Sequence, residues 1–149
     1  MDLPPVPERP AVTTRVSRPL TVSGIVGVPG GVGVDVSYQF NDRLALSGQA
    51  STWIAMTDVG AQARYFFVAY ERSGFFVAGG LHALVAPALF PFAAPAISAE
   101  VGGEFRAQNG FTIGVGAGVM GVYAPPGSEG GGNSFGIAPL ARLRFGFSF

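Results

Sequence analysis

An apolar side chain at every second position is the feature that most constrains this chain of 149 residues. The segment 32–40 reads VGVDVSYQF, so its valines and aromatic residues fall on one face and its Gly, Asp, Ser and Gln on the other. Side chains alternate between the two faces of a strand, whereas a helix repeats about every 3.6 residues. Eight segments with this period are separated by Gly-, Pro- or Asn-rich breaks, and they predict eight antiparallel strands over about 20–28, 32–40, 43–54, 59–68, 75–85, 97–106, 111–123 and 135–149.

Composition limits where so many apolar side chains can go. Hydrophobic residues make up 48% of the chain and charged residues only 12%, about half the usual share for a soluble domain. No run of about 18 apolar residues exists, so no helix is expected to span a membrane. The net charge of zero gives no basis for binding nucleic acid, and the absence of Cys excludes disulfides and thiolate metal sites. The glycine runs lack the Lys-Ser/Thr pair of a phosphate-binding loop, so no cofactor is expected.

Alternating strands can close into two kinds of barrel. A soluble, lipocalin-like barrel points its apolar face inward, whereas a membrane barrel points it outward and lines its interior, the lumen, with polar side chains. The polar face of this chain is poor in charge and rich in Gly, Ser, Ala and Gln, which suits a narrow lumen better than a soluble surface. Its titratable residues are nearly balanced in sign and are expected to pair inside the lumen: Asp35, Arg64, His82, Glu100, Glu104, Arg106, Arg142 and Arg144.

Aromatic side chains gather at one end of the predicted strands, beside short turns such as Asn41-Asp42. Connections at the opposite end, 86–96 and 124–134, are longer. Short periplasmic turns and longer outer loops are typical of outer-membrane barrels, so both termini are expected in the periplasm. The aromatic residues are expected to form a girdle at the periplasmic membrane interface: Phe40, Phe67, Phe105, Phe111, Phe145, Phe147 and Phe149.

The chain ends LRFGFSF, with a terminal Phe149 and apolar residues at every second position before it. In this respect residues 18–149 resemble the small outer-membrane barrels of the OmpA/OmpX-like kind. The resemblance implies an all-β, eight-stranded antiparallel up-and-down transmembrane barrel with a closed polar lumen and an apolar exterior. It also implies contact with outer-membrane lipid, and recognition of the last strand by the outer-membrane assembly machinery. An exported protein needs a signal peptide, which is expected to have been removed ahead of this sequence.

Two segments outside the predicted strands are candidate contacts for envelope proteins. Residues 1–17 are rich in proline and predict an extended periplasmic tail. The loop 86–96 carries Leu89, Phe90 and Phe92 without any charge. An exposed apolar loop indicates a partner or lipid, but the same residues fit a continuation of the two flanking strands into the outer interface.

No catalytic set is evident, so the chain is expected not to be an enzyme. The main hypothesis is a barrel with a structural or scaffolding role, and one form of that role is to be a subunit of a larger envelope assembly. The alternative is a narrow pore or small-solute transport barrel lined by the lumen arginines and glutamates. A lipid-modifying enzyme is a weaker hypothesis that requires His82 as a general base. We expect His82 to be a paired structural residue of the lumen.

Overall fold

A computed structural model describes residues 14–53, 56–69, 72–86, 92–124 and 134–149. These residues form one short helix and eight long strands. In chain order they are α1 (Thr14–Ser17), β1 (Leu20–Val28), β2 (Gly31–Gln39), β3 (Leu44–Trp53), β4 (Met56–Ala69), β5 (Ser73–Ala86), β6 (Phe92–Arg106), β7 (Phe111–Ala124) and β8 (Ser134–Ser148).

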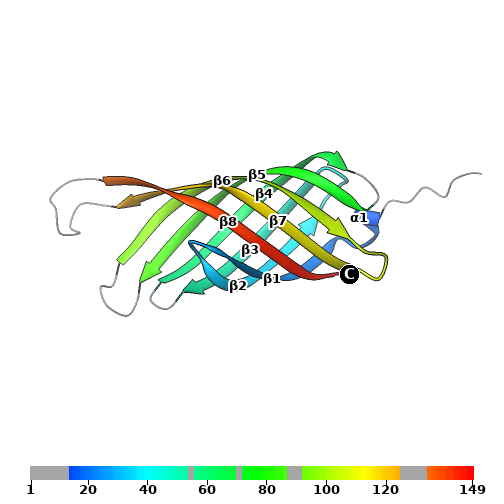
Figure 1. The fold of residues 1–149 in the computed structure, drawn as a ribbon, viewed down its shortest axis with the longest axis horizontal. Coiled ribbons are helices and arrows are strands. Elements are labelled where there is room, and N and C mark those ends of the chain that lie inside the picture. The colour runs from blue at the N-terminus through cyan, green and yellow to red at the C-terminus, as the bar shows by residue number, and fades with distance from the viewer. Residues whose placement is uncertain (1–13, 54–55, 70–71, 87–91, 125–133) are drawn as a thin grey trace, which may run out of the picture.

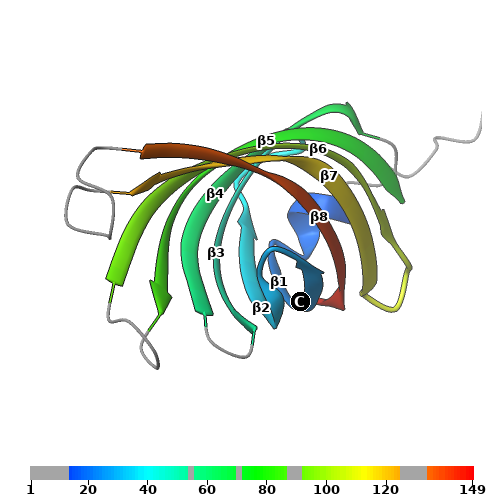
Figure 2. The same ribbon diagram turned by 60° about the vertical axis from the view of Figure 1, so that its left-hand side comes forward.

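The strands close into one barrel in which each pairs antiparallel with its neighbours along the chain (Figures 1 and 2). β8 returns to β1 and pairs with it from Thr21↔Ser148 to Val28↔Ala141. Closure satisfies the backbone hydrogen bonds that an open sheet would leave free at its edges. The predicted all-β, eight-stranded up-and-down barrel is therefore confirmed. We call the end that holds α1 and the C-terminus the near end, and the opposite end the far end.

Most strand limits match the predicted segments within a few residues, but the loop predicted over 86–96 is wrong. β5 extends to Ala86 and β6 begins at Phe92, so only residues 87–91 connect the two strands. Pro95 lies within β6, although proline cannot donate a backbone hydrogen bond to a neighbouring strand. The structure accommodates it because the pairing of β6 with β7 begins only at Ala96. The alternative in which the strands continue is the correct one.

The barrel buries polar side chains and exposes apolar ones. On β7, for example, Thr112 is buried while Ile113 and Val115 are exposed, and every strand carries exposed Val, Leu, Ile or aromatic residues. On β4, Phe66 is buried and Phe67 exposed by the same alternation, and a bulge shifts the pairing with β5 between Phe66 and Val68. This inside-out pattern is that of a membrane barrel. Among the described residues, no helix is long and apolar enough to cross a membrane.

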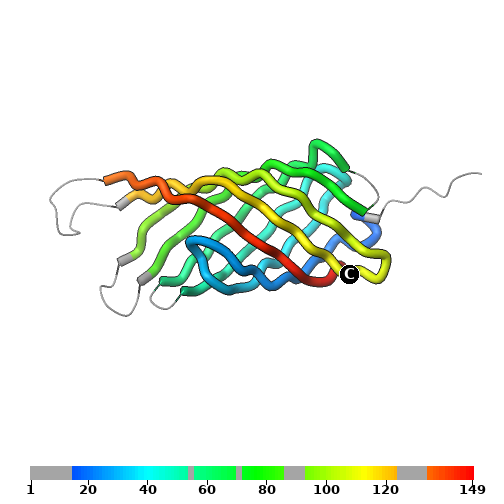
Figure 3. The backbone as a smooth tube through the Cα atoms, viewed as in Figure 1, coloured from blue at the N-terminus to red at the C-terminus, as the bar shows by residue number. Residues whose placement is uncertain are grey.

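The far end of the barrel wall is uneven. The β1–β2 hairpin is short, and pairing between β1 and β8 stops at Val28↔Ala141. Residues 134–140 of β8 therefore continue with no described strand paired to them on that side. The backbone tube shows this step clearly, because the hairpin ends well short of the tip of β8 (Figure 3).

Candidate functional site

All the residues predicted to line the lumen lie inside the barrel, and each is between 0% and 8% exposed: Asp35, Arg64, His82, Glu100, Glu104, Arg106, Arg142 and Arg144. They come from β2, β4, β5, β6 and β8. Their side chains form three hydrogen-bonded groups along the barrel: one in the middle, one at the near end and one toward the far end.

Glu100 is the centre of the middle group. Its carboxylate accepts hydrogen bonds from Arg144 Nη1 and Nη2, at 2.7 and 2.9 Å, and from Gln62 Nε2 at 3.0 Å. Arg142 Nη1 lies 3.4 Å from the same carboxylate. Gly116 on β7 makes room for this group, because a Cβ atom there would overlap the Glu100 carboxylate. Two guanidinium groups facing one acid supply the partners that a buried charge needs.

A second ion pair adjoins this group on the β2 and β4 side of the barrel. Arg64 Nη2 donates to Asp35 Oδ2 at 2.7 Å and to Ser47 Oγ at 3.2 Å. The guanidinium also lies 6.0 Å from the centre of the Phe76 ring. Phe76 packs edge to face with Phe66, so aromatic rings as well as polar groups fill this part of the lumen.

At the near end, α1 contributes a residue that the strand pattern did not predict. Arg15 Nη1 lies 3.0 Å from Glu104 Oε1, which also accepts from Arg106 Nε at 2.8 Å. The Arg15 guanidinium stacks 4.2 Å from the centre of the Phe66 ring. Burial lowers the pKa of Arg15, and the Glu104 carboxylate opposes that shift. Residues 14–17 thus form a helical turn at the near mouth, where an extended tail was predicted; the rest of that tail, 1–13, lies outside the described residues (Figure 2).

The third group lies toward the far end and links three adjacent strands. His82 Nδ1 on β5 is 2.9 Å from Asp58 Oδ1 on β4, and His82 Nε2 is 2.8 Å from Ser98 Oγ on β6. Gln49 Nε2 donates to the other oxygen of Asp58 at 3.2 Å, and Arg142 Nη2 lies 3.6 Å from that oxygen. The predicted pairing of His82 inside the lumen is confirmed.

Sequence reasoning missed Asp58 because the fourth segment was taken to begin at residue 59. Asp58 shares the even-numbered, inward face of β4 with Gln62 and Arg64, so an earlier start would have included it. Ser98 was placed on the polar face but not connected with His82. The register that joins them pairs His82 with Ala96 and Ser98 with Gly80, and no local pattern specifies it.

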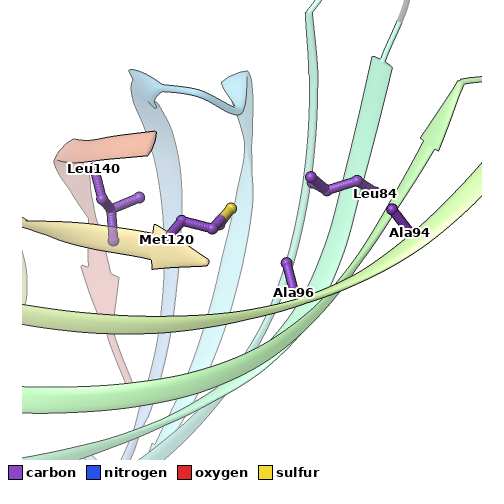
Figure 4. Close-up of a cluster of buried hydrophobic side chains, with 5 residues drawn as sticks. All are labelled: Leu84, Ala94, Ala96, Met120 and Leu140. Atoms are coloured by element: carbon purple, nitrogen blue, oxygen red, sulfur yellow. The ribbon is translucent and has the colours of Figure 1, made fainter. Parts of the chain in front are cut away.

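An apolar cluster closes the lumen beyond this third group. We call it the far apolar cluster, and its members, which lie on β5, β6, β7 and β8, are Leu84, Ala94, Ala96, Met120 and Leu140. They are between 0% and 4% exposed, and Met120 lies beside Leu140 (Figure 4). The prediction of a polar lumen is therefore accurate for the middle of the barrel, whereas its far mouth is lined by apolar side chains.

The predicted girdle residues all lie on the exterior, at the strand ends nearest the termini, and are between 37% and 66% exposed: Phe40, Phe67, Phe105, Phe111, Phe145, Phe147 and Phe149. Phe111 and Phe147 are register partners and meet edge to face at 5.7 Å. Of the predicted partner contacts, Leu89 and Phe90 lie outside the described residues, and Phe92 is the first residue of β6.

In the described part of the chain, no group of three His, Asp or Glu side chains is arranged to hold a metal ion. Comparison of the chain with known protein families, with curated proteins and with solved structures found no match.

Proposed function

We propose that this chain is an integral barrel of a bacterial outer membrane with a structural or scaffolding role, as a subunit of a larger envelope assembly. The observation that carries the proposal is the exterior, where side chains such as Val32, Val101, Val115 and Ile137 are between 59% and 74% exposed. Soluble proteins rarely expose contiguous apolar patches above a few hundred Å². A hydrocarbon environment removes this cost, and closed barrels are one of the two architectures that satisfy every backbone group there.

The filled lumen supports a structural role over transport. An eight-stranded barrel has just enough interior for its own side chains. Here Glu100 and its arginines occupy the middle, and the far apolar cluster packs the end beyond them. At the near mouth a cavity of about 50 Å³ lies between Arg18 and Arg106, which is room for one or two waters.

The girdle and the last strand support the orientation and the route of assembly. The seven girdle phenylalanines lie at the end that holds both described terminal segments, which supports the proposed periplasmic position of this end. Phe145, Phe147 and Phe149 alternate along the outer face of the closing strand. We propose that the outer-membrane assembly machinery recognises this strand.

Three experiments test this proposal. Heat-modifiable migration on a gel, with a need for detergent, is the expected behaviour of the purified chain. Affinity purification from detergent-solubilised envelopes is expected to recover a defined protein partner, and recovery of the chain alone would contradict the scaffold role. Planar-bilayer recording separates scaffold from pore, because a filled lumen conducts no ions and steady unitary currents would favour transport.

A further inference from the structure

We propose that Ser98, His82 and Asp58 form a nucleophile–base–acid triad that hydrolyses esters of long-chain fatty acids in membrane lipid. This activity goes beyond the structural role proposed above, and it differs from the expectation that the chain has no catalytic set. Four features support it: the triad geometry, the space made for it by glycines, the apolar cluster above it, and the step in the barrel wall beside it.

The hydrogen bonds have the order that nucleophilic catalysis requires. The Asp58 carboxylate can only accept, so it pairs with the His82 tautomer that carries its proton on Nδ1, 2.9 Å away, and in that neutral tautomer Nε2 is the acceptor for Ser98 Oγ at 2.8 Å. Gln49 Nε2 lies 3.3 Å from the same Nδ1. A carboxylate that fixes this tautomer makes the imidazole a general base toward the hydroxyl. Gln49 and Arg142 hold the second oxygen of Asp58, so the acid itself is fixed in place.

Two glycines provide the space that brings the triad together. A Cβ atom on Gly80 would lie 2.8 Å from both His82 Nε2 and Ser98 Oγ. A Cβ atom on Gly60 would lie 2.5 Å from His82 Nδ1. Any larger residue at either position would have to displace the imidazole or the serine. The two positions on β4 and β5 that face the ring are thus the ones that lack side chains.

The residues next to the triad are suited to an aliphatic chain. In the register of the sheet, His82 pairs with Ala96 and Ser98 pairs with Met120, and both partners belong to the far apolar cluster. Met is an adaptable side chain that yields to an apolar guest at low cost. On this side, the register partners of His82 and Ser98 therefore offer methyl, methylene and thioether groups to an acyl chain.

The step in the barrel wall lies beside this cluster. Residues 134–140 of β8 rise above the β1–β2 hairpin without a described partner on that side (Figure 3). Leu140, a member of the far apolar cluster, lies at the base of this step. Phe135 and Ile137, on the outer face above it, are 61% and 74% exposed. Because the far apolar cluster is between 0% and 4% exposed, an acyl chain that enters by this step must displace its side chains, Leu140 and Met120 first.

The reaction is an acyl transfer to water. Ser98 Oγ attacks the ester carbonyl carbon while its proton passes to His82 Nε2. The carbon–oxygen bond to the leaving alcohol breaks, and His82 returns the proton to that oxygen, leaving the acyl group on Ser98. Water then attacks the acyl-serine, with His82 taking its proton and delivering it to Ser98 Oγ. The products are the alcohol, which is a lysolipid when the substrate is a lipid, and the fatty acid.

The experiment uses the full chain purified in detergent micelles, with p-nitrophenyl butyrate and p-nitrophenyl palmitate as probes. Ser98→Ala and His82→Ala are each expected to lower kcat at least about 1,000-fold. Ser37→Ala, another buried lumen serine, is the matched control and is expected to retain full activity. A fluorophosphonate is expected to label Ser98 and no other residue, as located by mass spectrometry.

Two further variants separate catalysis from packing. Asp58→Asn is expected to lower kcat with little change in KM, because Asp58 positions the base and does not contact substrate. Met120→Trp fills the far apolar cluster, so palmitate ester hydrolysis is expected to fall much more than butyrate ester hydrolysis. Heat-modifiable migration of each variant shows that the barrel still folds.

Three results would overturn the proposal. These are no hydrolysis of either ester by a chain that shows heat-modifiable migration, hydrolysis unaffected by Ser98→Ala, or labelling at another residue. Any of them would leave Ser98, His82 and Asp58 as a packing group. Because p-nitrophenyl butyrate is a short-chain ester that dissolves in water as well as in micelles, its hydrolysis tests the triad separately from the membrane location. Loss of heat modifiability in the unaltered chain would instead contradict the proposed membrane barrel.

Discussion

Replacing Glu100 with Gln removes the charge that holds the middle of the lumen together. The amide is least disruptive if its nitrogen takes the place of Oε1, which loses only the 2.7 Å hydrogen bond from Arg144 Nη1. The opposite orientation would lose three contacts, those from Gln62, Arg142 and Arg144 Nη2. A hydrogen bond to a charged group contributes about 1.5–3 kcal/mol, and leaving a buried charge without its partner costs about 3–5 kcal/mol. We expect Glu100→Gln to lower the free energy of unfolding by about 3 kcal/mol.

Urea unfolding from lipid vesicles, followed by the fluorescence of the single tryptophan, Trp53, measures this change. With a denaturant slope of about 2 kcal/mol per molar, the midpoint is expected to fall by about 1.5 M. Asp42→Asn is the matched control, since the same chemical change at an exposed turn is expected to alter stability by less than about 0.5 kcal/mol. Equal midpoints for the two variants would refute the view that the Glu100 ion pairs stabilise the barrel.

Three other changes follow from the same structure. Gly116→Ala is expected to lower the free energy of unfolding by about 1–3 kcal/mol, and with it the urea midpoint, because the methyl overlaps the Glu100 carboxylate. Gly48→Ala, with open space around its Cβ position, is expected to leave the midpoint unchanged or raise it. Val101→Arg places a charge on the apolar outer surface and, if that surface lies in lipid, is expected to cost about 2–4 kcal/mol of unfolding free energy in vesicles, and a neutral effect would argue against lipid contact. Deletion of Phe149 is expected to reduce the amount of heat-modifiable barrel in the outer membrane without affecting refolding in detergent; equal amounts in the membrane would exclude a role for the last residue in assembly.

The strand period predicted most of the fold because it is local and repeated. Whether a side chain points inward or outward follows from its odd or even position along the strand. This alternation placed Glu100 and Arg144 in the lumen and Phe147 outside it. The turn at Asn109-Gly110 was equally local, since Gly110 has the positive φ of 93° that such hairpins favour.

The parts that could not be predicted depend on register and on residues outside the strands. Arg15 enters the lumen from a helical turn, which carries no strand period. Pro95 concealed the start of β6 because its tolerance depends on where β7 ends its pairing. The contact of His82 with Ser98 and Asp58 requires the relative shift of three strands, and only the assembled barrel fixes that shift.

The central claim is that the outer surface of this barrel lies in lipid. The chain contains no Cys, so a single cysteine introduced at Val115, which is 61% exposed, can carry a fluorophore at a defined exterior position. In vesicles, the account predicts strong quenching by lipids brominated on their acyl chains and little quenching by iodide in the water. Strong quenching by iodide with none by brominated lipid would contradict it.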